Sequence, residues 1–255
     1  MLDAGLLGAW GADGWLVLRG ALGEAVVDDV STAVDEVEGW AAVDGSPGLH
    51  HWEQTEHGPA LARSEDFVPH QAVLRDLICG PLRFQAGALL GEPAVLFKEK
   101  VNFKHPGGAG FAPHQDATAY RFVDHHVSCM VPLDPATAAS GCLDVVSGRH
   151  REGVLPNDRG RIDPAVVPTL RWEQAEVQPG DLLWFDSFTP HRSGTNTTDR
   201  PRRALYLTYN AAADGDHRAT YYADKATELA AADAGDRVRI SINDDFLGRP
   251  VEGRP

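Results

Sequence analysis

His114 and Asp116 stand two residues apart in the stretch APHQDA and are the first candidates for chemistry. Side chains of a β-strand alternate between its two faces, so residues i and i+2 share a face and these two can reach one point in space. An imidazole and a carboxylate at that point could hold a metal ion. The same pair is more often a hydrogen-bonded pair at a protein surface, so a metal site needs a third ligand.

The third candidate ligand is His191, which follows the apolar run LLWFDSF after the turn residues PGD. Two histidines and one carboxylate on one face of a metal leave the opposite positions open, which is the facial triad of non-haem Fe(II) enzymes. Oxygen chemistry requires such open positions. Taken separately, His191 could be an ordinary loop histidine, and Arg202 and Arg203 could be a solvated charge pair on the next predicted strand.

The elements that position these residues change in character along the chain. Residues 14–20 predict a strand, residues 23–38 an amphipathic helix, and residues 68–80 a second helix that stops at Gly80 and Pro81. Beyond residue 94, short alternating runs predict strands: AVLFKEKVNFK, HVSCMVPLD, GCLDVVSGRH, GDLLWFDSF and RRALYLTYN. The chain is therefore mainly β, a sandwich or small barrel with helices outside it, and periodicity alone does not separate the two.

The metal candidates and their surroundings resemble the phytanoyl-CoA dioxygenase family of Fe(II)- and 2-oxoglutarate-dependent oxygenases. The resemblance covers most of the chain and rests on the segments GADGWLVLRGAL, PHQDA, SGCLDVVSGRH, PGDLLWF and HRSGTNTTDRPRRAL. It implies one domain with a double-stranded β-helix core, a jelly roll of the cupin type, and flanking α-helices. In sequence, the N-terminal helical flank would cover about 1–93, the core about 94–215 and a C-terminal extension 216–255.

The resemblance also implies a role for each matching residue. The family's iron ligands fall on His114, Asp116 and His191, its 2-oxoglutarate-binding arginine on Arg202 and its small hydroxyl residue on Ser193. 2-Oxoglutarate would chelate the iron and extend its distal carboxylate to Arg202, with a hydroxyl donor from Ser193. With O2 as the second cosubstrate, succinate and CO2 would form and a C–H bond would be hydroxylated.

Two positions refine this expectation. The family's halogenases have a small residue in place of the carboxylate ligand, so Asp116 favours hydroxylation over halogenation. Arg203 follows Arg202 directly and would point to the opposite face of a regular strand, away from the cosubstrate.

Three of the four lysines of the chain lie in the predicted strand KEKVNFK. Alternation places four polar residues on one of its faces: Lys98, Lys100, Asn102 and Lys104. Phe97 and Glu99 would face the other way. One interpretation is an edge strand that lysines protect against aggregation. The other is an active-site wall, in which Lys98 assists 2-oxoglutarate while Lys100, Asn102 and Lys104, with Gln115 from the metal motif, bind an anionic substrate.

Residues 39–70 are rich in glycine, proline and histidine and show no sustained period. Long aperiodic segments in compact domains are often functional loops. We expect this segment at the mouth of the pocket, with four candidate substrate contacts: His50, His51, Trp52 and Glu53. A surface loop with scattered histidines accounts for the same pattern.

These features predict a dioxygenase that hydroxylates a small polar molecule, anionic or zwitterionic. Within the family, KEKVNFKHPGGAGFAPHQDATAY most resembles the branch that hydroxylates small phosphonates such as 2-aminoethylphosphonate. Alternatives are a natural-product tailoring hydroxylase of the same family, a zinc-dependent hydrolase or isomerase on a similar barrel, and a binding protein without turnover. Arg202 and Ser193 disfavour the hydrolase, which needs no carboxylate clamp, and the complete triad disfavours the inactive protein.

Composition and charge limit the kinds of partner that we expect the protein to bind. A chain of 255 residues, 43% of them hydrophobic, can bury a full core, and a net charge of -14 argues against nucleic-acid or anionic-membrane partners. The three cysteines, Cys79, Cys129 and Cys142, lack metal-ligand spacing and predict free thiols in a reducing compartment. No basic leader or long apolar run is evident. We expect a cytoplasmic monomer or small homo-oligomer whose partner is a small-molecule substrate.

Overall fold

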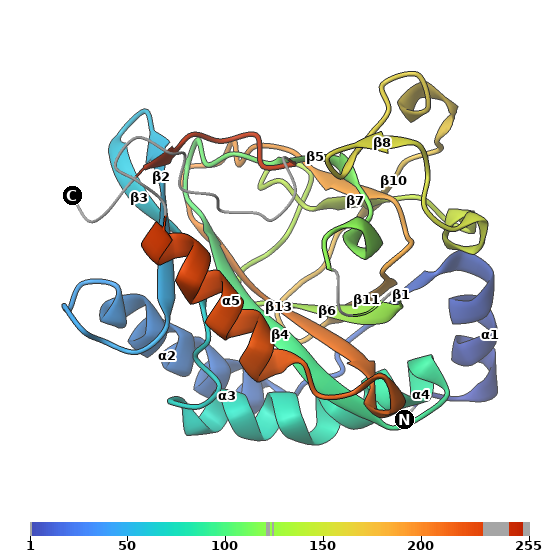
Figure 1. The fold of residues 1–255 in the computed structure, drawn as a ribbon, viewed down its shortest axis with the longest axis horizontal. Helices are drawn as coiled ribbons and strands as arrows, with labels where there is room; N and C mark the ends of the chain where they lie inside the picture. Colours follow the sequence, from blue (N-terminus) through green and yellow to red (C-terminus); the bar gives the residue numbers. More distant parts are fainter. Residues whose placement is uncertain (1, 121–122, 124, 232–244, 252–255) are drawn as a thin grey trace.

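Two antiparallel β-sheets form the centre of the computed structural model, which describes residues 2–120, 123, 125–231 and 245–251 (Figure 1). The larger sheet has the strand order β1 (Trp15–Leu18), β11 (Leu182–Asp186), β6 (His126–Pro132), β13 (Arg202–Ala211), β4 (Ala94–Lys104), β3 (Gly58–Glu65), β2 (Leu49–Thr55), β14 (Pro250–Val251). The smaller sheet has the order β10 (Glu173–Ala175), β7 (Leu143–Val145), β12 (His191–Ser193), β5 (Phe111–His114), β9 (Arg161–Ile162), β8 (Asn157–Asp158). The predicted mainly β jelly-roll fold with flanking helices is confirmed.

The helices that precede residue 94 flank the larger sheet on the face turned away from the smaller one (Figure 1). The structure contains α1 (Ala4–Asp13), α2 (Glu24–Trp40), α3 (Ala72–Leu77), α4 (Arg83–Leu90) and α5 (Arg218–Ala231). Alternation along β13 supplies two cores at once, because Leu205 and Leu207 pack with the helices whereas Ala204 and Tyr206 pack between the sheets. The inner face of the larger sheet is thus free to carry a site.

Strand β4 runs through the larger sheet between β13 and β3, so it is not an edge strand. Edge protection therefore does not explain its lysines. Val101 and Phe103 join the helix-facing core, as alternation predicts. The expectation fails at Phe97, which contacts Tyr120 together with Lys98, because the pairing with β13 shifts register between Thr208 and Tyr209.

The segment expected as a long loop, residues 39–70, instead contains the hairpin of β2 and β3, and the loop prediction is wrong for that part. The pairing of the two strands shifts register between His51 and Trp52, where Ala62 is an extra residue of β3. In β3, Arg63, Ser64 and Glu65 are polar and yet buried, so no apolar pattern marks the strand. The N-terminal flank (about 1–93), the core (about 94–215) and the C-terminal extension (216–255) all contribute strands to the larger sheet. β1, β2 and β3 precede residue 94, and β14 follows residue 215.

The helix expected over residues 68–80 breaks at Gly80, as its sequence predicts. The backbone angles of Gly80 are non-helical, and the kink over Ile78–Leu82, which contains Pro81, separates α3 from α4. The carbonyl oxygen of Ile78, next to the kink, accepts a hydrogen bond of 2.9 Å from the buried Tyr209 hydroxyl.

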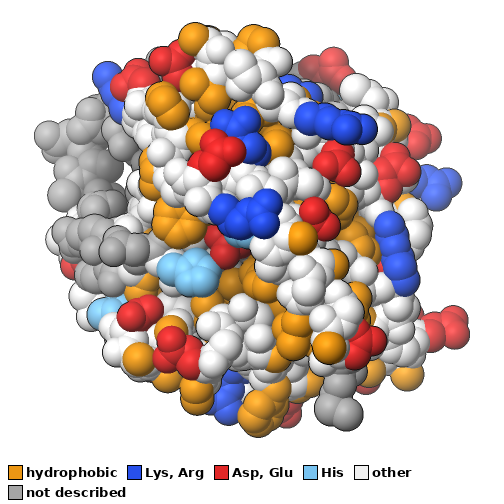
Figure 2. Space-filling view, turned by 90° about the vertical axis from the view of Figure 1, so that its right-hand side faces the viewer, with side chains coloured by type: hydrophobic (Ala, Val, Ile, Leu, Met, Phe, Trp, Pro, Cys, Tyr) orange, Lys and Arg blue, Asp and Glu red, His pale blue; other side chains and the backbone are white. Residues whose placement is uncertain are grey.

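On the face drawn in Figure 2, basic and acidic side chains are interspersed. In the part of the chain that the structure describes, no helix has the length and apolar character needed to cross a membrane. The three cysteines are free thiols.

Candidate active site

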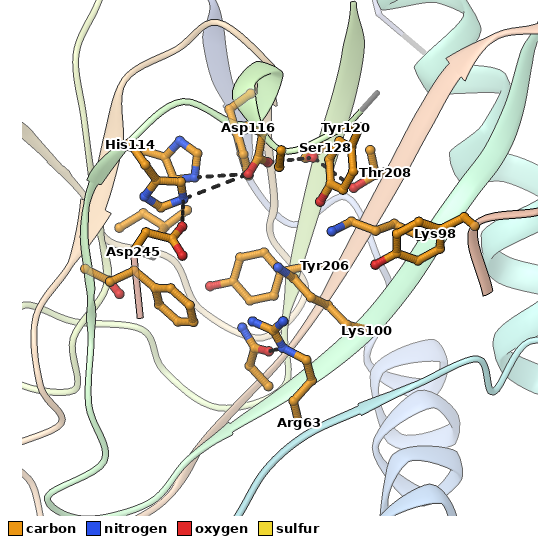
Figure 3. Close-up of a pocket in the computed structure, with 18 of the residues that line it drawn as sticks. Arg63, Lys98, Lys100, His114, Asp116, Tyr120, Ser128, Tyr206, Thr208 and Asp245 are labelled. Atoms are coloured by element: carbon orange, nitrogen blue, oxygen red, sulfur yellow. Dashed lines mark hydrogen bonds and ion pairs between the residues drawn. The ribbon is translucent and has the colours of Figure 1, made fainter. Parts of the chain in front are cut away.

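His114, Asp116 and His191 meet on the inner side of the smaller sheet. His114 ends β5 and pairs directly with His191 at the start of β12. Each histidine Nε2 lies 3.9 Å from Asp116 Oδ1 (Figure 3), and one ligand atom from each of the three residues lies within 4.8 Å of the others. Ligand atoms that share one ion at about 2 Å each lie about 3–4 Å apart, so the three side chains fit a single metal ion.

The backbone fixes which nitrogen of each histidine faces the site. His114 Nδ1 lies 2.7 Å from the Ala112 carbonyl oxygen, and His191 Nδ1 lies 3.0 Å from the Thr189 carbonyl oxygen. A carbonyl oxygen only accepts, so Nδ1 donates in both residues and Nε2 keeps its lone pair for a metal.

The charges of the triad also suit a cation. Burial, with the nearby His114, lowers the pKa of His191 to about 4, which keeps the imidazole neutral near pH 7. Burial alone would raise the pKa of Asp116, but the two histidines and the lysines of β4 lower it below the usual range. A carboxylate beside two imidazoles is the donor set that Fe(II) takes in facial-triad enzymes.

Arg202 lies at the end of the pocket away from the metal site and is 2% exposed. Its Nη2 donates to the Gly141 carbonyl oxygen at 2.9 Å and its Nη1 to the Tyr206 hydroxyl at 3.3 Å. Its buried Nε has no hydrogen-bond partner within the described residues. Ser193 lines the same pocket, so a carboxylate placed there would meet a guanidinium and a hydroxyl.

Arg203 points the other way, as the alternation of a strand predicts. Its Nε donates to Asp134 Oδ2 at 3.0 Å, and its Nη1 pairs with Asp35 of α2. The neighbouring arginines of β13 therefore serve different faces of the sheet.

A cationic wall faces the metal site from the larger sheet. It consists of Lys98, Lys100 and Asn102 of β4 with Arg63 of β3, all of which line the pocket (Figure 3). Arg63 Nε donates to Asn102 Oδ1 at 3.0 Å, and Lys98 Nζ lies 4.3 Å from the ring centroid of Tyr120. Burial lowers the pKa of Lys98 to about 8 and that of Lys100 well below its ordinary value, so an anionic ligand would stabilise both ammonium groups.

Helix α5 closes one side of the pocket with Tyr221 and Lys225. Arg218 fastens the helix to β4 through Glu99, whose Oε1 lies 2.6 Å from Arg218 Nη2. Tyr222 adds a 2.9 Å hydrogen bond from its hydroxyl to the Glu99 carbonyl oxygen. Glu99 thus anchors α5 on one face of β4 while Lys98 and Lys100 serve the pocket on the other.

Six residues expected to contact substrate do not line this pocket: Lys104, Gln115, His50, His51, Trp52 and Glu53. The Gln115 amide donates to the carbonyl oxygens of Gly153 and Phe188 and accepts from the Leu155 N–H, so it ties loops together. Residues 50–53 belong to β2, two strands away from β4, and Glu53 accepts from the Ala109 N–H. Their partner strand β3 supplies Arg63 instead.

Lys98 lines the pocket, where its Nζ lies over the Tyr120 ring, and its expected contact with 2-oxoglutarate stays a prediction. Lys104 reaches Ser193 Oγ at 3.1 Å and the Gly194 carbonyl oxygen at 2.6 Å, behind the end that holds Arg202. The lysine close to the Arg202 end is therefore Lys104.

Sequence reasoning missed several pocket residues, among them Arg63, Tyr120, Tyr221, Lys225 and Asp245. They come from segments far apart in the chain, and no motif connects them. The spacing of Tyr221 and Lys225, four residues apart in a helical run, is a signal that could have placed both on one helix face.

A facial triad between two antiparallel sheets, with a buried arginine at the other end of the same pocket, defines the class of Fe(II)- and 2-oxoglutarate-dependent oxygenases. Residues 10–204 match the family described as Phytanoyl-CoA dioxygenase (PhyH). The chain belongs to this family, and it is a 2-oxoglutarate-dependent dioxygenase with iron as its metal.

Individual relatives resemble the chain over nearly its whole length. It is 44% identical to the methylphosphonate hydroxylase of Gimesia maris over 250 residues, which cover 96% of each chain. It is 37% identical to the 2-aminoethylphosphonate dioxygenase of Uncultured bacterium HF130_AEPn_1 over 221 residues, 85% of this chain and 84% of that one. The solved structure of EctD from S. alaskensis with 2-oxoglutarate and 5-hydroxyectoine superposes with a TM-score of 0.72, at 23% identity over 84% of this chain and 77% of that one.

Proposed function

We propose that this protein hydroxylates a C–H bond of a small phosphonate. The substrate, 2-oxoglutarate and O2 would give the hydroxylated phosphonate, succinate and CO2, which balances all atoms. The observation that carries the proposal is the cationic wall of Arg63, Lys98 and Lys100 across the pocket from the triad. A phosphonate offers up to two negative charges and three acceptor oxygens, which suits three basic side chains, of which Arg63 and Lys98 are buried.

Two further observations support this substrate. The relatives described above are named for methylphosphonate and 2-aminoethylphosphonate. The pocket is lined mainly by polar and charged side chains, which suits a polar ligand better than a long acyl chain.

The mechanism divides the pocket between cosubstrate and substrate. His114, Asp116 and His191 would hold iron, which with 2-oxoglutarate and O2 supplies the oxidising power for C–H hydroxylation. Arg202 and Ser193, supported by Lys104, bind the distal carboxylate of 2-oxoglutarate. Lys98 acts with Lys100 on the substrate, and the wall orients the carbon next to phosphorus toward the triad.

The experiment is succinate release from 2-oxoglutarate with added Fe(II), measured with methylphosphonate, 2-aminoethylphosphonate, amino acids and an acyl thioester. We expect stimulation by phosphonates. Lys100→Met should lower the phosphonate-dependent rate at limiting substrate about 10- to 100-fold, the equivalent of ~1.5–3 kcal/mol for hydrogen bonds to a charged group. Slow succinate release without substrate should persist.

A matched control is Arg171→Met, which removes an exposed cation away from the pocket and should leave both rates unchanged. Stimulation by the acyl thioester and not by any phosphonate would contradict the proposal. A cytoplasmic location and a monomeric or small homo-oligomeric state stay predictions from composition.

A further inference from the structure

The pocket contains a second carboxylate that the proposed hydroxylation does not use, that of Asp245. The residue is 3% exposed, and its Oδ2 lies 3.2 Å from Nε2 of His114 (Figure 3). Its buried Oδ1 has no hydrogen-bond partner within the residues that the structure describes. A buried carboxylate oxygen without a donor is costly, so this group calls for a partner.

Backbone contacts hold Asp245 in this position. The Ala112 N–H donates to the Asp245 carbonyl oxygen at 2.7 Å, and the Leu247 N–H donates to the Gly110 carbonyl oxygen at 3.0 Å. The Phe246 ring packs on Phe111 with the ring centroids 5.3 Å apart. The carboxylate is therefore a built part of the pocket wall.

Asp245 is not placed as a fourth ligand of the same ion. The group of residues whose ligand atoms lie within 4.8 Å of one another, among those the structure describes, is His114, Asp116 and His191. Once Nε2 of His114 binds iron, it has no proton to donate to Asp245. The carboxylate then lacks the contact seen here and faces the pocket with both oxygens in need of a donor.

The charges of the pocket are arranged in two poles. Asp245 lies on the side of His114, whereas Lys98 and Lys100 lie across the pocket from it (Figure 3). Phe111 lines the pocket beside Asp245, and the Arg63 guanidinium carbon lies 5.7 Å from its ring centroid. A ligand that matches this wall carries a negative group toward the lysines and a positive group toward Asp245.

We propose that Asp245 binds the ammonium group of a zwitterionic aminoalkylphosphonate, so that the protein selects this class over phosphonates without a cation. The inference rests on the proposed function and makes it more specific. It distinguishes between the two substrate types for which the relatives are named, because methylphosphonate has no group that a carboxylate would bind.

The test compares 2-aminoethylphosphonate with n-propylphosphonate, in which a methyl group replaces the ammonium group at nearly the same size. Binding is measured by anaerobic calorimetry on protein loaded with Fe(II) and 2-oxoglutarate, for the wild type, Asp245→Asn and Asp245→Glu. The wild type should bind 2-aminoethylphosphonate at least about tenfold more tightly than n-propylphosphonate. Asp245→Asn should remove that preference while n-propylphosphonate affinity stays within about twofold.

Iron content, measured on the same samples, should be unchanged in Asp245→Asn. Asp245→Glu keeps the charge and should retain part of the preference. Equal losses for both ligands, or a loss of iron, would show that Asp245 supports the metal site or the fold and would overturn the inference. A wild type that binds both ligands equally would overturn it too, with phosphonate hydroxylation still standing. If the wild type bound no phosphonate at all, the proposed function itself would fall, and the inference with it.

Discussion

Lys104 and Arg202 lie directly opposite each other on β4 and β13, and both donate to the carbonyl oxygen of Gly141, at 3.3 Å and 2.9 Å. Gly141 has a φ of 71°, and a Cβ there would lie 2.4 Å from the Gly194 carbonyl oxygen. Only glycine fits this position without a shift. One backbone oxygen thus accepts hydrogen bonds from both basic side chains.

From this relationship we predict that Lys104→Met weakens 2-oxoglutarate binding about tenfold, because Ser193 loses the cation that donates to its hydroxyl and Arg202 loses its neighbour. The turnover number at saturating 2-oxoglutarate should stay close to that of the wild type. Steady-state kinetics against 2-oxoglutarate, at fixed phosphonate, measure both quantities. A rise in the phosphonate KM alone would instead place Lys104 among the substrate contacts.

The two adjacent arginines should respond very differently to substitution. Arg202→Met removes the guanidinium that meets the distal carboxylate, and the apparent 2-oxoglutarate requirement should rise by the equivalent of ~2–4 kcal/mol. Arg203→Met should leave that requirement unchanged and lower only the free energy of unfolding, through its lost bonds to Asp134. Kinetics against 2-oxoglutarate and thermal unfolding of both variants test this prediction. A raised 2-oxoglutarate requirement in Arg203→Met, and not in Arg202→Met, would show that Arg203 binds the distal carboxylate.

His114→Ala, Asp116→Ala and His191→Ala should each abolish Fe(II)-dependent succinate formation, since two ligands hold iron weakly and in the wrong geometry. Iron content after desalting gives a readout independent of turnover. Any of the three variants that kept wild-type iron and activity would not have lost a ligand. Cys129→Ser is a suitable control for a buried substitution outside the pocket, and it should retain iron.

The ion pair that anchors α5 should affect stability and phosphonate-dependent turnover more than it affects 2-oxoglutarate binding. Arg218→Met leaves the buried Glu99 carboxylate without its cation and should lower the free energy of unfolding by ~2–4 kcal/mol. Because α5 carries Tyr221 and Lys225, phosphonate-dependent turnover should fall more than 2-oxoglutarate affinity. Chemical denaturation measures the free energy of unfolding, calorimetry measures the affinity for each ligand, and steady-state kinetics measure the phosphonate-dependent turnover. Full phosphonate-dependent turnover in Arg218→Met would show that α5 does not shape the substrate site.

The metal site and β4 could be anticipated from sequence because their information is local. His114 and Asp116 share a strand face by simple alternation, and so do Lys100 and Asn102. The hairpin of β2 and β3 could not, because the extra residue Ala62 breaks the period of β3 and several buried side chains of that strand are polar.

Asp245 illustrates what local patterns lack. It reaches His114 only after the chain has passed through the whole fold, and nothing in the residues around it marks that contact. Alternation predicts which way a side chain faces on its own strand, but the pairing of distant segments depends on the tertiary structure. Arg63 entered the pocket unpredicted for the same reason.

The position of the pocket residues along the sequence suggests how substrate choice evolves. The triad, Arg202 and the lysines of β4 all precede the end of β13, whereas α5 and Asp245 follow it. The residues proposed for iron, 2-oxoglutarate and the phosphonate group thus come earlier in the sequence than Asp245, which is proposed to bind the ammonium group. If Asp245 has the proposed role, replacing the segment after β13 with that of a relative would change which substituent of the phosphonate the pocket binds. The hydroxylation itself would be kept.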